Sequence, residues 1–178
     1  VTPMVRVPWL DPGDIMKALD AGAYGIICPM INSRAEAERL ISYMHYPPQG
    51  QRSFGPTRAI FAAGADYGQK ADDEILAFAM IETAEAMKNL DEIVTTPGLD
   101  GVYIGVRNHV HGNTNGVYIG PADLTLGLTG RKYPTGFDRE EPEMIEAIRH
   151  VLARTHAAGI RAGIHTGSAA YAARAVGW

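Results

Sequence analysis

Short, almost uninterrupted apolar runs alternate along this chain with segments of helical periodicity. Strands that are apolar on both faces are typical of parallel sheets, and a helix after each of them indicates a βαβ unit. The runs that predict strands are PMVRVPW (3–9), YGIICPM (24–30), ILAFAMI (75–81), GVYIG (101–105 or 116–120) and IRAGIH (160–165). About five such units fit into the 178 residues, so the sequence predicts one α/β domain with parallel strands.

Helix-start signals follow several of these runs. Asp11 is a good N-cap and is followed by Pro12, which is favoured at the first helical position. Ser33 and Glu36 have the spacing of a capping box, and Thr83 predicts the N-cap of the helix after 75–81. The segments from 141 and from 168 are predicted to be helical as well. The region 45–73 is rich in Pro and Gly, and we predict that it is irregular.

Five parallel units leave two architectures open. A (β/α)₈ barrel needs eight units and typically about 250 residues, whereas a doubly wound sheet can be complete with five. The pattern of strands and helices alone does not choose between them.

Composition and charge exclude some classes of protein. The net charge is −4 and no basic run is present, which argues against a nucleic-acid partner. No apolar run approaches the roughly 20 residues of a membrane span. A single cysteine, Cys28, excludes an intramolecular disulfide and suits a reducing compartment, so we expect a cytoplasmic protein.

Polar residues lie within or directly after four of the predicted strands. Sites in parallel α/β folds gather at the carboxyl ends of the strands, so these side chains are expected to share one rim. They are Arg6, Glu82, Asp123 and His165.

The two acids among them suggest a cation site. Two carboxylates, completed by water and substrate oxygens, suit an octahedral hard cation such as Mg²⁺ or Mn²⁺. A structural alternative exists for each acid. Glu82 precedes a predicted helix, where a negative charge is favourable, and Asp123 lies in a predicted loop, where Asp is a common turn or cap residue.

Long stretches of the sequence resemble a known family. VRVPWLDP (5–12), CPMINSRAEAERLISYMHYPPQGQRSFGPTRA (28–59), IETAEAMKNLDEI (81–93) and GVYIGPADL (116–124) are similar to the HpcH/HpaI aldolase and citrate lyase family. The most similar branch is that of the metal-dependent 4-hydroxy-2-oxoheptanedioate aldolases. The resemblance implies a partial TIM (β/α)₈ barrel and a class II aldolase. Such an enzyme cleaves 4-hydroxy-2-oxo acids to pyruvate and an aldehyde with Mg²⁺, Mn²⁺ or Co²⁺.

The resemblance also implies roles for individual residues. Glu82 and Asp123 match the two metal-binding carboxylates of the family. Arg6 matches the arginine that contacts the keto oxygen of the substrate. Met80 stands where the founding branch has a polar Gln, which puts in doubt a substrate hydrogen bond made there.

Further matches concern substrate contacts and a supporting acid. Gly120, Pro121 and Ala122 match the tight segment whose backbone lies against the carboxylate of the pyruvyl unit. Asp20 matches an acid that, in the family, supports a catalytic histidine on the second barrel strand. His165, at the end of its own predicted strand, is a further candidate for substrate binding.

This chain also departs from the family pattern. Residues 1–178 correspond to about units three to seven of eight, so we expect one incomplete barrel domain. The pentapeptide Gly-Val-Tyr-Ile-Gly occurs at 101–105 and at 116–120, and 106–115 has the character of an insertion. We predict that the second copy forms the strand, because only that copy is followed at once by Asp123.

Three functional interpretations follow. The first is the metal-dependent aldolase, which by resemblance would be a homo-oligomer acting on a small 2-oxo acid, with no nucleic-acid or membrane partner. The second is a citrate lyase or malyl-CoA lyase type of enzyme that acts on acyl-CoA substrates, although no basic nucleotide site is evident. The third is a non-catalytic fragment that lacks the first two and the last barrel units.

Overall fold

A five-stranded parallel sheet forms the centre of the protein. The computed structural model describes residues 2–99 and 116–178. The strands pair in chain order, as β1 (Met4–Arg6), β2 (Gly25–Cys28), β3 (Leu76–Ile81), β4 (Gly116–Ile119) and β5 (Arg161–Ile164). The prediction of an α/β fold with parallel strands is confirmed, although each strand is shorter than its apolar run.

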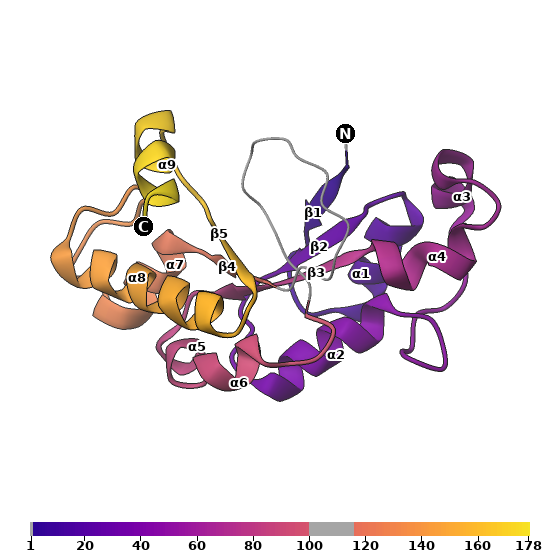
Figure 1. The fold of residues 1–178 in the computed structure, drawn as a ribbon, viewed down its shortest axis with the longest axis horizontal. Coiled ribbons are helices and arrows are strands. Elements are labelled where there is room, and N and C mark those ends of the chain that lie inside the picture. The colour runs from indigo at the N-terminus through magenta and orange to yellow at the C-terminus, as the bar shows by residue number, and fades with distance from the viewer. Residues whose placement is uncertain (1, 100–115) are drawn as a thin grey trace.

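The helices connect the strands and cover the sheet. They are α1 (Pro12–Asp20), α2 (Arg34–Met44), α3 (Thr57–Ala63), α4 (Tyr67–Glu74), α5 (Ala84–Lys88), α6 (Leu90–Val94), α7 (Pro121–Thr129), α8 (Pro142–Ala157) and α9 (Ala169–Val176). Helices α1, α2, α6 and α8 contact one another in that order. In Figure 1, α2, α6 and α8 lie along the same side of the sheet.

The main core lies between the sheet and this helical layer. The β3 segment Ala77–Ile81 is buried along its whole length, as expected for a central parallel strand. Apolar side chains of the helices pack against it, among them Leu40, Met44, Ile93, Ile148 and Val151, all fully buried. Burial of these side chains is the main force that holds the helices to the sheet.

The predicted helix starts are confirmed. The Asp11 carboxylate accepts a hydrogen bond from the Asp14 N–H at 2.9 Å, and Ser33 Oγ accepts one from the Glu36 N–H at 3.3 Å. Thr83 Oγ1 accepts from the N–H of the third residue after it and so caps α5. Each such cap stabilises its helix by about 1 kcal/mol.

The prediction that 45–73 is irregular holds for 45–56 and was wrong for the rest of the region. This region contains α3 and α4, and neither helix has a side-chain cap. Instead, Ala59, Tyr67 and Ala71 pack with Tyr46 in a second apolar cluster, separate from the main core. Tertiary packing rather than local sequence stabilises these short helices, which is why the sequence pattern did not predict them.

The second copy of the repeated pentapeptide is in the sheet, as predicted. Residues Gly116–Ile119 pair with β3 on one side and with β5 on the other. The first copy (101–105), the predicted insertion (106–115) and the histidines of HVH (109–111) lie outside the described residues.

Two further details differ from the sequence predictions. Helix α7 begins directly after Gly120, where we predicted only a tight segment. The helix predicted after Thr83 is divided at Asn89 into α5 and α6.

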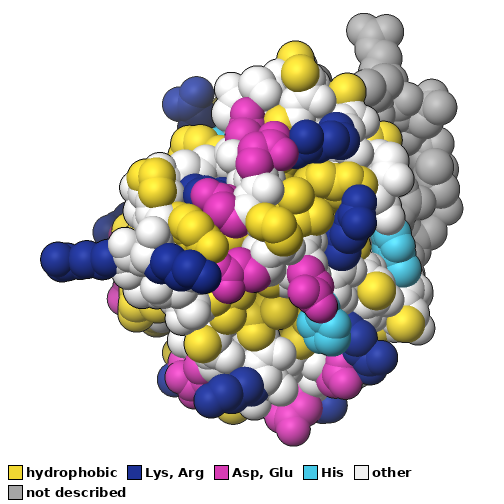
Figure 2. Space-filling model, turned by 90° about the vertical axis from the view of Figure 1, so that its left-hand side faces the viewer, with side chains coloured by type: hydrophobic (Ala, Val, Ile, Leu, Met, Phe, Trp, Pro, Cys, Tyr) yellow, Lys and Arg dark blue, Asp and Glu magenta, His cyan; other side chains and the backbone are white. Residues whose placement is uncertain are grey.

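The end of the molecule that carries α7, α8 and α9 exposes apolar side chains among acidic and basic ones (Figure 2). The large apolar residues exposed on these elements and their loops are Leu126, Leu128, Phe137 and Val176. Within residues 2–99 and 116–178, none of the helices has the length and apolar character needed to cross a membrane.

Candidate functional site

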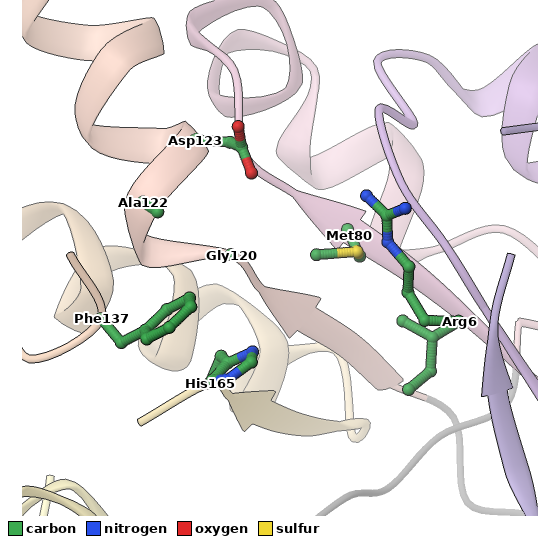
Figure 3. Close-up of a pocket in the computed structure, with 8 residues that line it drawn as sticks. Arg6, Met80, Gly120, Ala122, Asp123, Phe137 and His165 are labelled. Carbon is green, nitrogen blue, oxygen red and sulfur yellow. The ribbon is translucent and has the colours of Figure 1, made fainter. Parts of the chain in front are cut away.

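A cavity of about 390 Å³ opens at the carboxyl edge of the sheet (Figure 3). Its lining residues come from the ends of all five strands, α7 and the loop before α8, and they are Arg6, Ile27, Met80, Gly120, Ala122, Asp123, Phe137 and His165. The parallel arrangement explains this gathering, because the carboxyl ends of all the strands meet at one edge. Three of the four predicted rim residues, Arg6, Asp123 and His165, therefore line one pocket.

Arg6 and Asp123 lie on the same side of this pocket. Arg6 is the last residue of β1, and Asp123 is in the first turn of α7. In Figure 3 the guanidinium and the carboxylate are both drawn above the ring of His165, and Met80 lies between that ring and the guanidinium. A permanent positive charge and a carboxylate at one edge can bind opposite ends of a polar ligand.

The segment Gly120–Pro121–Ala122 forms the start of α7. Gly120 is the N-cap and Pro121 occupies the first helical position, where its missing N–H costs no intrahelical bond. The N–H groups of the first turn have no partner within the helix and carry a partial positive charge. This helix start can therefore accept an anionic group such as a carboxylate.

Glu82 lies directly behind Gly120. The side chain is only 1% exposed, and its Oε1 accepts a hydrogen bond from the Met30 N–H at 2.8 Å. Oε2 is buried and has no hydrogen-bond partner among residues 2–99 and 116–178. A Cβ at position 120 would lie 2.5 Å from Oε2, so any residue larger than glycine here would force the Glu82 carboxylate to move.

The electrostatics of Glu82 reflect its burial. Loss of water raises the pKa of the carboxyl above its ordinary value, and the Met30 N–H opposes this shift. The negative charge of Asp123 raises the pKa further, whereas the positive charge of Arg6 lowers it. The carboxylate thus lies within electrostatic reach of both predicted partners.

A divalent cation fits these donors. Oε2 of Glu82 is a buried acceptor with no hydrogen bond from the described residues, and Asp123 is the second carboxylate nearby. In the described part of the chain no group of three His, Cys, Asp or Glu side chains could hold a metal. Oxygens of water or substrate would therefore fill the remaining positions, as is usual for Mg²⁺.

His165 and Phe137 form a flat wall on the opposite side of the pocket (Figure 3). Their rings stack with centroids 3.9 Å apart and an angle of 5° between the planes. The Gly167 N–H donates to Asp138 Oδ1 at 2.6 Å and so connects the loops that carry the two rings. Phe137 was not among the predicted site residues, because no motif in the sequence marks a residue in the loop before α8.

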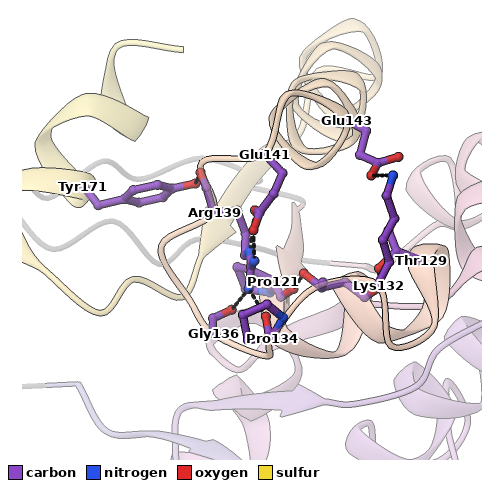
Figure 4. A network of polar contacts seen from close by, with 10 residues as sticks. Pro121, Thr129, Lys132, Pro134, Gly136, Arg139, Glu141, Glu143 and Tyr171 are labelled. Atoms are coloured by element: carbon purple, nitrogen blue, oxygen red, sulfur yellow. Dashed lines mark hydrogen bonds and ion pairs between the residues drawn. The ribbon is translucent and has the colours of Figure 1, made fainter.

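A network around Arg139 holds this loop in place (Figure 4). Arg139 is nearly fully buried, and its guanidinium donates to the carbonyl of Pro134 at 2.8 Å and to the carboxylate of Glu141. The hydroxyl of Tyr171, from α9, donates to the Arg139 carbonyl at 3.0 Å. These contacts order the loop that carries Phe137.

Asp20 does not reach this pocket in the structure. It is the last residue of α1, which returns from the carboxyl edge of the sheet toward the amino edge. Its carboxylate accepts a bond from Arg52 Nη2 at 2.8 Å. The catalytic role predicted for Asp20 therefore has no support from the geometry of the described residues.

Several known proteins have sequences similar to this chain. A family model described as HpcH/HpaI aldolase/citrate lyase matches residues 1–167. A hydroxypyruvate/pyruvate aldolase from Rhizorhabdus wittichii is 48% identical over 96% of this chain and 61% of its own length. A 4-hydroxy-2-oxo-heptane-1,7-dioate aldolase from Shigella flexneri is 34% identical over 91% of this chain and 54% of its own. The chain thus spans a little over half the length of these relatives.

The fold agrees with this match. The crystal structure of an HpcH/HpaI aldolase/citrate lyase family protein from Burkholderia cenocepacia J2315 superposes with a TM-score of 0.79 and 28% identity. The superposition covers 97% of this chain and 62% of that one. The sequence pattern left a (β/α)₈ barrel and a doubly wound sheet open. The match favours the barrel, which is the architecture that the resemblance to this family implied. The chain belongs to the HpcH/HpaI aldolase/citrate lyase family.

Proposed function

We propose that this chain carries the metal and 2-oxo acid site of a divalent-metal-dependent carbon–carbon lyase. The observation that carries the proposal is the buried Oε2 of Glu82, which lacks a partner among the described residues and lies behind Gly120 within electrostatic reach of Asp123. The substrate class is 4-hydroxy-2-oxo acids, and the products are an aldehyde and pyruvate, or hydroxypyruvate where C3 of the substrate also carries a hydroxyl group. The names of the two aldolase relatives support this class.

The residues of the pocket fit this chemistry. A bound Mg²⁺ or Mn²⁺ would supply Lewis acidity toward the keto oxygen of the substrate. Glu82 and Asp123 would hold the cation, and the start of α7 would bind the substrate carboxylate. Arg6 would stabilise the negative charge that develops on the keto oxygen as the bond between C3 and C4 breaks.

The sheet is, in this proposal, an arc of a (β/α)₈ barrel. Two observations support it: a connected layer of helices lies along the sheet, and the fold is similar to that of a family member. In a barrel the carboxyl ends of the strands form one circular rim. The pocket at the ends of the five strands would then be part of that rim.

A release assay tests the proposal. The protein is incubated with a 4-hydroxy-2-oxo acid, and 2-oxo acid product is followed with lactate dehydrogenase, before and after treatment with a chelator. We expect release that stops with the chelator and returns on addition of Mg²⁺ or Mn²⁺. Release of the 2-oxo acid at an unchanged rate after treatment with the chelator would contradict the proposed role of a divalent metal. Turnover of an acyl-CoA thioester instead of the oxo acid would favour the acyl-CoA lyase interpretation.

A further inference from the structure

Met30 has an unusual backbone conformation at the site. Its φ is +57°, and it is the one non-glycine residue with positive φ that the described ranges contain. This left-handed conformation is disfavoured for residues with a side chain, and it persists where surrounding contacts impose it. Its result is that the Met30 N–H points at Glu82 Oε1 at 2.8 Å.

Asn32 supplies the contacts that hold Met30. Its side-chain Nδ2 donates to the Met30 carbonyl at 3.1 Å, and its Oδ1 accepts from the hydroxyl of Thr83. Thr83 directly follows Glu82 in the chain. The four residues therefore close a ring: Glu82 to the Met30 N–H, the Met30 carbonyl to Asn32, Asn32 to Thr83, and Thr83 through the backbone to Glu82.

Asn32 is itself fixed on both sides. Its N–H donates to Glu36 Oε2 at 2.7 Å, and its carbonyl accepts from Asn89 Nδ2 at 2.8 Å. Its amide can satisfy the ring in one orientation only, with the NH₂ group toward a carbonyl and the oxygen toward a hydroxyl. The ring thus ties the loop after β2 to the loop after β3.

We propose that Asn32 is a positioning residue for the carboxylate of Glu82. Asn32 holds Met30 in its left-handed conformation, so that the Met30 N–H is bonded to Oε1 of Glu82. The other oxygen, Oε2, then remains free on the side of Gly120 and the pocket. Without this ring the Glu82 side chain could turn and present neither oxygen in a fixed place. That Oε2 then receives a divalent cation rests on the function proposed above.

The first test measures Mn²⁺ binding to the purified chain by electron paramagnetic resonance. Asn32→Ala should weaken the affinity by about 10-fold to 100-fold, as is typical when a residue that orients a metal ligand is lost. Ser33→Ala is the matched control: it removes the cap of α2 one residue away and leaves the ring intact. We expect it to bind Mn²⁺ as the unmodified chain does. Equal affinities for Asn32→Ala and the unmodified chain, or equal losses in both variants, would overturn the proposal.

A second test needs no metal. Hydrogen exchange of the Met30 amide is followed by NMR, because this N–H is protected only while it donates to Glu82. Asn32→Ala should abolish the protection of Met30, whereas Ser33→Ala should retain it. Unchanged protection in Asn32→Ala would refute the positioning role. If the unmodified chain fails to bind Mn²⁺, the proposed function fails, and the amide exchange still decides whether Asn32 positions Glu82.

Discussion

The buried oxygen Oε2 of Glu82 lies against the Cα of Gly120, and a Cβ at position 120 would be 2.5 Å from it. The backbone of Gly120 has φ −96° and ψ 90°, which any residue can adopt. The requirement for glycine here is therefore one of space and not of backbone freedom. A methyl group would occupy the volume between the carboxylate and the pocket.

Gly120→Ala is thus expected to displace Glu82 and weaken Mn²⁺ binding by at least about 10-fold, a loss typical of a disturbed ligand environment. Isothermal titration calorimetry measures this affinity. Gly167→Ala is the control, because its Cβ would meet Asp138 at an ordinary contact distance of 3.5 Å. Equal affinities for Gly120→Ala and the unmodified chain would contradict the need for glycine beside the Glu82 carboxylate.

Glu82→Gln separates metal binding from stability. Burial raises the pKa of this carboxyl above its value in the unfolded chain, so its charged form is disfavoured in the folded protein. This destabilisation of the folded protein is absent below the pKa that Glu82 has in the unfolded chain. It grows as the pH rises toward and through the pKa that Glu82 has in the folded protein. At neutral pH without metal, Glu82→Gln should therefore raise the melting temperature while it abolishes Mn²⁺ binding.

Asp123→Asn is the companion variant for this prediction. Asp123 is exposed, so its substitution should leave the melting temperature nearly unchanged and still remove the metal. Scanning calorimetry of both variants measures the melting temperature, and titration calorimetry measures the Mn²⁺ affinity. A Glu82→Gln variant that melts lower than the unmodified chain in metal-free buffer would contradict the account of the buried charge.

The sequence predicted the parallel sheet and the rim residues for a physical reason. Strands buried on both faces and capped helices leave local patterns, and parallel strands bring their carboxyl ends together. Arg6, Asp123 and His165 could therefore be placed in one pocket from their positions after strands. The same rule predicted Glu82 at this rim as well, whereas in the structure its side chain is buried behind Gly120 and does not line the pocket.

Other parts of the site could not be predicted because they depend on contacts distant in sequence. Phe137 reaches the pocket through a loop held by Arg139, and the left-handed Met30 depends on a ring that spans two loops. Helix α4 depends on packing with Tyr46 across some 20 residues of chain. None of these arrangements produces a hydrophobic periodicity or a helix-capping motif in the sequence.

Arg52 should be one of the most sensitive positions in the second apolar cluster. Its side chain is fully buried, its guanidinium lies 4.5 Å from the ring centroid of Tyr46, and it donates to Asp20 at 2.8 Å and to the Tyr67 hydroxyl at 3.2 Å. Removal of one partner of a buried pair typically costs about 3–5 kcal/mol. We expect Arg52→Ala to lower the free energy of unfolding by an amount in this range, measured by urea denaturation.

Arg34→Ala is the matched control for that measurement. Arg34 pairs with Glu38 at 2.9 Å on the exposed side of α2. Exposed pairs of this spacing contribute about 0.3–0.5 kcal/mol. A loss for Arg52→Ala no larger than that for Arg34→Ala would mean that the cluster around Tyr46 does not depend on its buried cation.

Asp138 should make the wall of Phe137 and His165 sensitive to acid. Hydrogen bonds from the Ser168 side chain and from the Gly167 N–H lower the pKa of the Asp138 carboxyl below its ordinary value. A carboxyl with a depressed folded pKa stabilises the fold above its unfolded pKa of about 3.9 and loses that contribution as pH falls through the folded value.

Acidification from pH 6 to pH 3 should therefore loosen the loop before α8 from the start of α9. The ring proton resonances of Phe137 report this change, because the stacked imidazole shifts them while the two loops remain joined. Asp138→Asn keeps the shape of the side chain and removes its titration, so its resonances should already resemble the loosened form at pH 6. Identical pH profiles for Asp138→Asn and the unmodified protein would show that another carboxyl controls this wall.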